Sequence, residues 1–235
     1  INRPVHLVSG PLVNHTIRAE LDELQKADLG RKCGNKDRRT LDPPPVVRIK
    51  LFEIINEGTS DETEQAILIS DAGYALAYGF ICLVDIFPWP PPSHASDSRS
   101  QQTRSQDTAQ AVIDGVPIAE QDSCTQAFVG ATFISASCLI YEGKQTLLFV
   151  FPDIACSVDG IFLIRYRALN LFSYMLETER LPILAECWGG PVTIWPTKDF
   201  PGLAESTDLT KACLFLDPRR STHILRSISH ASVSP

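Results

Sequence analysis

Long apolar segments are missing from this sequence of 235 residues. The longest candidate, residues 74–87, contains Gly79 and Asp85 and is shorter than the roughly 20 residues that a membrane-spanning helix requires. The first residues also lack the charged and then apolar pattern of a secretory signal. We therefore expect an intracellular protein that does not associate with membranes.

Catalytic and phosphate-binding motifs are missing as well. The sequence has no G-x-S-x-G nucleophile elbow, no G-x-x-x-x-G-K phosphate loop and no H-E-x-x-H zinc-binding helix. A cysteine and a histidine that meet only in the folded protein would escape such a search, so a cysteine nucleophile stays open as an alternative. These absences favour a protein that is not an enzyme and that needs no cofactor or metal.

None of the seven cysteines belongs to a C-x-x-C motif, which argues against a zinc ribbon and against a thioredoxin-type redox site. We expect them to be buried free thiols in a reducing compartment. The content of 44% hydrophobic and 21% charged residues is ordinary for a globular chain, so a core can form. The length fits one large all-β domain or two small domains.

Positive charge is scarce except in one place. The whole chain has 21 basic and 28 acidic residues, a net charge of −7, which excludes a generally polycationic protein. Between Arg31 and Lys50, however, seven basic residues face only two acidic ones, which leaves the other 215 residues with a net charge of −12. An acidic body with one basic segment fits a protein that meets a polyanion in one orientation. A solvated turn or a nuclear-import signal would have the same composition, and charge alone leaves these readings open.

The pattern of apolar residues predicts an all-β protein. Val47, Ile49 and Leu51 alternate with Arg48 and Lys50, which is typical of a half-buried strand. Turn residues separate further apolar segments, which we predict to be strands at residues 5–8, 66–70, 74–87, 128–140, 145–151, 161–171 and 191–195. Many short strands with frequent turns indicate a β-sandwich.

Two segments are expected to depart from this pattern. Ile17, Leu21, Leu24 and Leu29 lie near helical spacing and Gly30 follows, so residues 17–29 are predicted to form a short amphipathic helix that packs on the sandwich. Residues 88–110 begin with a proline cluster and continue with Ser, Gln, Thr and Asp, a composition that predicts a flexible, disordered inserted loop.

Three ordered motifs resemble the velvet domain of fungal regulators. Residues 36–47 (KDRRTLDPPPVV) resemble its opening signature, and residues 148–153 (LFVFPD) and 158–167 (VDGIFLIRYR) resemble its central strands. Residues 198–211 resemble its closing motif. Residues 17–32 and 181–187 are similar to the versions found in mushroom-forming fungi. The resemblance covers about residues 3 to 212 and implies one velvet domain at residues 1–216, followed by a divergent tail at 217–235.

This resemblance implies an immunoglobulin-like β-sandwich of the Rel and p53 kind. It also implies a sequence-specific DNA-binding regulator of development, sporulation and secondary metabolism. Such a regulator forms homo- or heterodimers with other velvet proteins and joins a methyltransferase-like regulator in the nucleus, with a cytoplasmic pool. The family's DNA-contacting residues map onto Lys36, Arg38 and Arg39. Arg31 and Lys32 join them as candidates because they belong to the same basic segment.

The sequence departs from the family pattern in two places. Gly34 and Asn35 stand where the family has a further basic residue, which is expected to weaken DNA binding. After Lys211 the final basic strand of the family is hardly recognisable, so a sheet edge is expected to stay open for a partner to cover. The main alternative is therefore a velvet-fold adaptor that binds proteins and touches DNA weakly or not at all.

Overall fold

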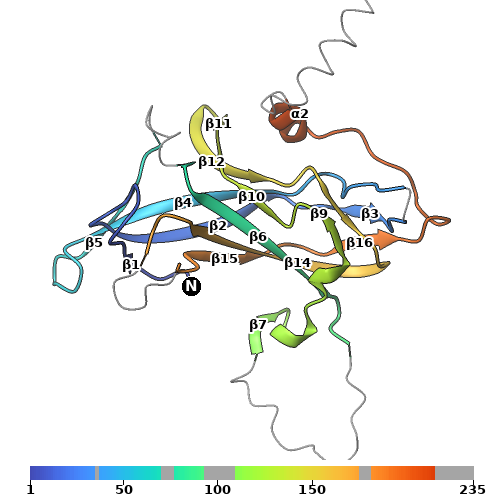
Figure 1. Cartoon of the computed structure of the whole chain (residues 1–235), viewed down its shortest axis with the longest axis horizontal. Coiled ribbons are helices and arrows are strands. Elements are labelled where there is room, and N and C mark those ends of the chain that lie inside the picture. Colours follow the sequence, from blue (N-terminus) through green and yellow to red (C-terminus); the bar gives the residue numbers. More distant parts are fainter. Residues whose placement is uncertain (35–36, 70–76, 93–108, 175–180, 215–235) are drawn as a thin grey trace, which may run out of the picture. The chain divides into compact units, whose positions relative to one another are not determined.

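The structure is a computed structural model that describes residues 1–34, 37–69, 77–92, 109–174 and 181–214 (Figure 1). The chain divides into two compact units, Ile1–Pro201 and Gly202–Pro235. The first unit is an all-β sandwich, as the sequence predicted, and it contains every strand of the described chain.

Two six-stranded sheets make up the sandwich. The first sheet has the order β1 (Val5–His6), β2 (Thr16–Gln25), β4 (Val46–Ile55), β12 (Lys144–Val150) and β11 (Ser137–Tyr141), with β5 (Thr63–Ala66) paired to β4. The second sheet has the order β10 (Phe133–Ser135), β6 (Phe80–Pro88), β14 (Gly160–Asn170), β16 (Val192–Trp195) and β3 (Leu29–Arg31), with β15 (Ala185–Trp188) paired to β14. Among the strands that the structure describes, only the β16–β3 pair is parallel.

Alternation of side chains places the core between these sheets. On β4, Val47, Ile49 and Leu51 are buried while Arg48 and Lys50 are partly exposed, as predicted for a half-buried strand. A tight turn follows Tyr141, between the segments predicted as strands at 128–140 and 145–151. Glu142 and Gly143 both have positive φ angles there and connect β11 to β12.

A partly buried glutamate links the two sheets across the core. Glu23 on β2 accepts a hydrogen bond of 2.8 Å from the hydroxyl of Tyr166 on β14 and one of 2.9 Å from the amide of Gly190. Burial raises the pKa of Glu23, although both hydrogen bonds oppose that rise. Gly189 is required nearby because a Cβ atom there would overlap the Glu23 carboxylate.

The predicted helix at residues 17–29 is wrong, because this segment forms β2 and the start of β3. Ile17, Ala19 and Leu21 are buried at every second position, which is the period of a strand, and β2 pairs with β4 along its length. An irregularity between Glu23 and Gln25 then shifts the register. Because of this shift, the apolar residues of the segment do not alternate regularly, and their spacing resembles that of an amphipathic helix.

Other boundaries also differ from the prediction. The segment expected as one strand at 128–140 is divided into β9 (Phe128–Gly130), β10 and β11, and β6 begins only at Phe80. Most of the predicted insertion, residues 93–108, lies outside the described residues. Its last two residues begin a hairpin that the sequence did not predict, formed by β7 (Ala109–Ile113) and β8 (Val116–Ala119).

The segment after this hairpin is fixed to the outer face of the second sheet by a buried arginine. Arg165 on β14 is fully buried and donates hydrogen bonds to Asp85 on β6 and to Glu120 in the 3₁₀ turn η2 (Glu120–Asp122). The arginine also lies over the rings of Phe87 and Trp188. Loss of this side chain would leave two carboxylates without their shared cation.

The second unit contributes helix α2 (Asp208–Leu214). The Thr207 hydroxyl accepts a hydrogen bond of 3.0 Å from the amide of Thr210 at the start of this helix. In the described part of the chain, no helix has the length and apolar character needed to cross a membrane. The predicted domain boundary at residue 216 falls outside the described residues and stays a prediction.

Candidate nucleic-acid interface

The basic segment of the sequence forms a loop whose two ends are fixed to one short strand. The described residues of this basic loop, 32–34 and 37–40, follow β3 and lead back toward β4. The Cys33 amide donates to the Cys156 carbonyl and the Leu41 amide donates to the Ile154 carbonyl, each at 2.8 Å. Both acceptors belong to β13 (Ile154–Cys156), which pairs with β9. Backbone hydrogen bonds therefore hold the base of the loop independently of its charges.

Arg38 crosses this small β9–β13 ladder. Its guanidinium forms an ion pair with the Asp153 carboxylate and donates a hydrogen bond of 3.1 Å to the Asp153 carbonyl. The path is open because residue 130 is glycine. Gly130 has a φ of 116°, and a Cβ atom there would overlap both the Asp153 carbonyl and the guanidinium of Arg38.

Each other described basic residue of the predicted site also has a carboxylate nearby. Lys32 Nζ lies 2.8 Å from Oδ1 of Asp159, and Arg39 Nε lies 3.9 Å from Oδ1 of Asp37. Arg31 forms an ion pair with the other carboxylate oxygen of Asp37, Oδ2. The side chains of Lys32, Arg38 and Arg39 are 46%, 37% and 49% exposed, whereas that of Arg31 is only 12% exposed. Exposure thus favours the first three as contacts for a ligand. Lys36, the fifth predicted site residue, lies outside the described residues.

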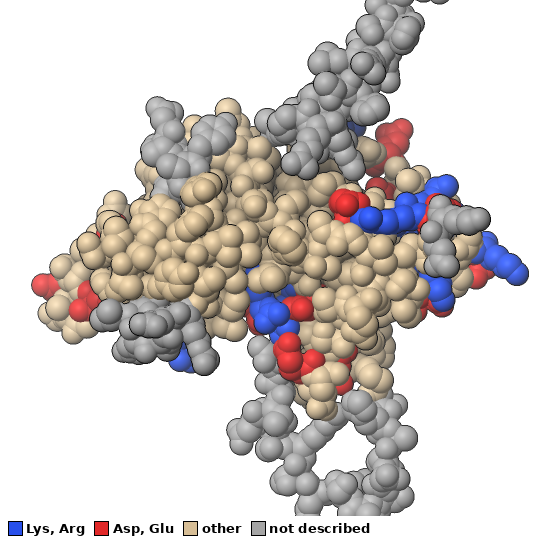
Figure 2. Space-filling model, viewed as in Figure 1, with Lys and Arg blue, Asp and Glu red and all other residues tan. Residues whose placement is uncertain are grey.

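The carboxylates reduce the charge that the sequence suggests for this region. The four described site residues, Arg31, Lys32, Arg38 and Arg39, have three carboxylates beside them, so these contacts leave an excess of one positive charge. The hydrogen bond from Lys32 lowers the pKa of Asp159, which therefore stays ionised at neutral pH. Figure 2 shows Lys and Arg side chains gathered, with acidic side chains among them, at the end of the sandwich where β3 and β16 end in Figure 1.

Arg48 and Lys50 belong to the same basic run in the sequence but not to this site. Both project from β4 and contact Asp22 on β2, at 2.8 Å and 2.6 Å. Burial raises the pKa of Asp22, but the hydrogen bonds from Lys50 and Arg48 outweigh it and lower that pKa overall. The structure therefore separates the basic segment into a loop at one end of the sandwich and a pair on its first sheet.

Sequence reasoning missed the residues that support the loop. Asp153, Asp159 and Gly130 lie far along the chain from Arg38 and Lys32, with 115 positions between Arg38 and Asp153. Asp153 and Asp159 did stand at or beside the motifs that resemble the velvet domain, and each comes next to a strand end. Their position at these motifs was a signal in the sequence, but no rule of residue spacing connects Asp153 and Asp159 to the basic loop.

The cysteine thiols are poorly suited to act as nucleophiles. All seven cysteines are free, and burial raises the pKa of Cys156 to about 11 and that of Cys187 to about 12. Such thiols are protonated at neutral pH and are poor nucleophiles. Among the described residues no group of three or more His, Cys, Asp or Glu side chains is arranged to hold a metal ion.

The fold and the site define a β-sandwich protein that presents a carboxylate-braced basic loop from one end. Comparison with known proteins identifies the family to which the chain belongs. Residues 19–214 match the family model described as "Velvet factor", and the chain belongs to the velvet family.

Two basidiomycete proteins illustrate the relationship. A protein of Schizophyllum commune named "Probable velvet family sexual development regulator" is 46% identical over 211 residues, which is 90% of this chain and 74% of the relative. A protein of the same description from Laccaria bicolor is 39% identical over 248 residues, covering 90% and 71% of the two chains. "Velvet complex subunit 2" of Gibberella moniliformis is 30% identical over 128 residues, 52% of this chain and 28% of the relative.

Proposed function

We propose that this protein is a sequence-specific, double-stranded DNA-binding regulator of transcription that controls fungal development, sporulation and secondary metabolism. The observation that carries the proposal is the basic loop. It is fixed at its base by the backbone of β13 and presents three cations that are more than a third exposed, on a chain whose net charge is −7. The names of the relatives supply the developmental role.

The ion pairs of the loop suit an exchange of carboxylate for phosphate. Arginine binds both groups with the same planar fork, so a DNA phosphate can replace Asp153 or Asp37 without a new loop conformation. Contacts of this kind position the protein on the duplex, and an arginine that reaches a guanine edge would add sequence preference. Lys32, Arg38 and Arg39 are the described side chains that fit these roles, together with Lys36.

Assembly is part of the same proposal. Relatives named as subunits of a velvet complex support homo- or heterodimers with other velvet proteins. A methyltransferase-like regulator is the further partner that the family resemblance implies. A regulator of this kind acts in the nucleus and has a cytoplasmic pool, which fluorescence microscopy of the tagged protein in a fungal host would test.

A second function is favoured by the same carboxylates. Because Asp37, Asp153 and Asp159 neutralise most of the loop, the protein would bind DNA weakly if phosphates cannot displace them. It would then act as a velvet-fold adaptor between proteins.

Mobility-shift assays on fungal promoter DNA separate these two functions. The purified protein is titrated, with and without a second velvet protein, against promoter fragments and against the same fragments with shuffled sequence. The proposed regulator prefers particular fragments, and its affinity falls steeply with salt. Weak binding that is indifferent to sequence and to the second velvet protein would leave only the adaptor.

A further inference from the structure

The turn that connects β13 to β14 lies beside the start of the basic loop. The Cys33 amide donates a hydrogen bond of 2.8 Å to the Cys156 carbonyl at the end of β13, and Lys32 Nζ lies 2.8 Å from Oδ1 of Asp159 in the turn. This β13–β14 turn, residues 157–159, is therefore joined to two successive residues of the loop, once through the backbone and once through an ion pair. A ligand bound to the start of the loop is within reach of the turn.

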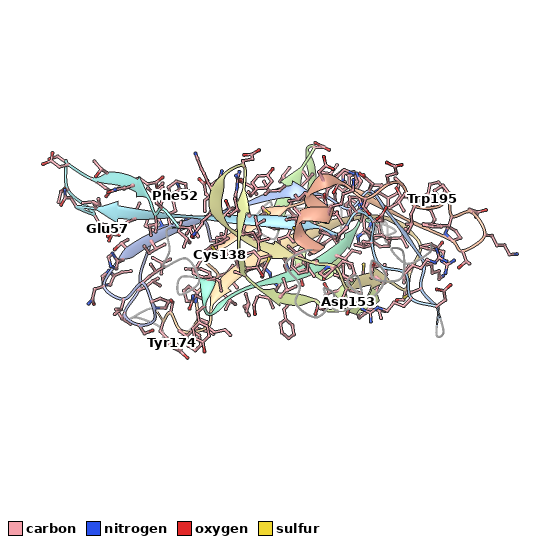
Figure 3. All side chains as sticks on the ribbon, turned by 90° about the horizontal axis from the view of Figure 1, so that it is seen from above. Phe52, Glu57, Cys138, Asp153, Tyr174 and Trp195 are labelled. Atoms are coloured by element: carbon pink, nitrogen blue, oxygen red, sulfur yellow. The ribbon has the colours of Figure 1, made fainter. Side chains whose placement is uncertain are left out.

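The end of β16 lies at the same place. The Lys32 amide donates a hydrogen bond of 2.8 Å to the Trp195 carbonyl, the last residue of β16. Because β16 is antiparallel to β14, its end adjoins the start of β14 and the turn before it. Figure 3 shows Trp195 and Asp153 in one half of the sandwich, with Tyr174 in the other.

A second cation reaches this end of the sheet from the turn after β16. The Asp199 amide donates a hydrogen bond of 3.1 Å to the Pro196 carbonyl, which closes a tight turn. Lys198 in this turn is exposed, and among the described residues it has no carboxylate within ion-pair distance. Lys32 and Lys198 thus place positive charge from two segments at the sheet end that carries the β13–β14 turn.

Val158 stands out in this charged surrounding because its side chain is apolar and 46% exposed. A single exposed valine is ordinary on a protein surface. This valine, however, directly precedes the carboxylate that pairs with Lys32, on a turn joined to the basic loop. Its position, rather than its exposure alone, makes it a candidate for contact with the ligand of the loop.

Hydrogen bonds hold the backbone around Val158 in place. The amide and the hydroxyl of Ser157 both donate to the Ala127 carbonyl, at 2.8 Å and 2.9 Å. The Cys156 thiol donates a hydrogen bond of 3.3 Å to the Val158 carbonyl. Because the backbone is fixed before DNA binds, little conformational entropy is lost when the valine side chain makes a contact.

The chemistry of valine limits what it can recognise on DNA. Its two methyl groups neither donate nor accept hydrogen bonds, so they gain nothing from phosphates or from the polar edges of guanine, cytosine and adenine. In the major groove, the apolar group that distinguishes one base from the others is the C5 methyl of thymine. Cations that bind phosphates position a protein on the duplex but carry no sequence information, so an apolar contact beside them adds it.

We propose that Val158 is a sequence-reading residue of the DNA interface and packs against the C5 methyl group of a thymine in the major groove. The inference rests on the proposed function, since the basic loop must lie on duplex DNA for Val158 to reach a base. Lys32 and Lys198 hold the phosphate backbone beside the contact. Burial of one methyl group contributes about fourfold in affinity.

The test replaces every thymine of a promoter fragment by uracil, which removes the C5 methyl groups and keeps the hydrogen-bonding edges of the bases. Mobility shifts of the full chain compare the thymine and uracil forms of a fragment that the parent prefers, at one salt concentration. The parent is expected to bind the thymine form at least about fourfold more tightly. Val158→Ser should lose about fourfold on the thymine form and bind the uracil form like the parent. Val158→Thr, which keeps one methyl group, should fall between them.

The matched control is Val112→Ser, which removes the same side chain from a 64% exposed position on β7 and should keep the parent's ratio of affinities. Lys198→Ala should weaken both forms by the same factor, since a phosphate contact carries no base information. All variants should melt within a few degrees of the parent, because the substituted side chains are exposed. A Val158→Ser variant that keeps the parent's preference for thymine would overturn the inference, as would an equal loss of that preference in Val112→Ser.

The outcomes distinguish this inference from the proposed function. If the parent prefers particular fragments but residue 158 does not affect the ratio, the proposed function stands and Val158 is not part of the interface. If the parent binds no fragment in preference to its shuffled form, the proposed function is contradicted and this inference fails with it.

Discussion

The two ends of β14 differ in how their exposed side chains are held. At the basic end, Lys32 and Arg38 are held by carboxylates that solvent and salt can screen. At the other end, where the rings of Tyr78 and Phe172 stack, neutral hydrogen bonds with buried Asn170 hold the backbone beneath the rings. The basic end is therefore suited to exchanging partners with a polyanion. The contacts at the other end carry no charge, so salt should not disrupt them.

The largest loss of stability is expected from a substitution in the middle of β14, because it should destabilise both ends of the strand. Arg165→Ala removes a fully buried cation, takes the ion-pair partner from Glu120 and leaves Asp85 paired with Arg167, which costs about 3 kcal/mol of unfolding free energy. Chemical denaturation measures this loss. Arg3→Ala, at an exposed position, is the control and should leave stability unchanged. Equal stability of both variants would show that the buried cluster does not fix η2.

The next effect separates the two ends. Asn170→Ala leaves the Tyr78 carbonyl and the Phe172 amide without partners, at a cost of about 1–3 kcal/mol per unsatisfied group. Gly130→Ala introduces a Cβ atom at a φ of 116° against the Asp153 carbonyl, at a cost of about 1–3 kcal/mol. We expect both variants to melt at a lower temperature than the parent, but only the second to weaken DNA binding in mobility shifts. If the two variants impaired DNA binding equally, the two ends would not be independent.

A smaller effect is expected on the pH dependence of stability, through Glu23 and its hydrogen bond between the two sheets. Burial raises the pKa of Glu23 above its unfolded value of 4.5, so its contribution to stability is fully present below pH 4.5 and is lost as pH rises through the folded pKa. Glu23→Gln should therefore flatten the fall of unfolding free energy as pH rises above 4.5. Denaturation curves at a series of pH values measure this slope. A slope identical to that of the parent would place the titration elsewhere.

The smallest effect on stability is expected at Asp159. Lysine pairing lowers the pKa of this exposed carboxyl, so its contribution is present above the unfolded value of 3.8 and is lost as pH falls through the folded pKa. Exposed pairs contribute little, so Asp159→Asn should melt like the parent. Because it frees Lys32, the variant should bind DNA more tightly at low salt. Weaker binding would mean that Asp159 positions Lys32 rather than competing for it.

The sandwich itself was predictable, because alternation on β4 and frequent turns are local signals. The helix predicted at residues 17–29 was wrong because an irregularity after Glu23 breaks the alternation of β2, and only pairing with β4 identifies the strand. The basic loop was predictable from charge and from the family resemblance. The ion pair between Arg38 of the loop and Asp153 was not predictable, because that contact depends on two strands and on a glycine at residue 130.

The central claim is that the basic loop binds DNA, and the salt dependence of binding tests it most directly. Replacing Lys36, Arg38 and Arg39 together with alanine should reduce the slope of log affinity against log salt by about 2.7, at about 0.9 per phosphate contact. The control replaces Arg3, Lys50 and Lys144, which removes the same charge elsewhere and should leave the slope nearly unchanged. Circular dichroism should be the same for all three proteins. A loop variant that binds DNA as tightly as the parent at every salt concentration would contradict the account.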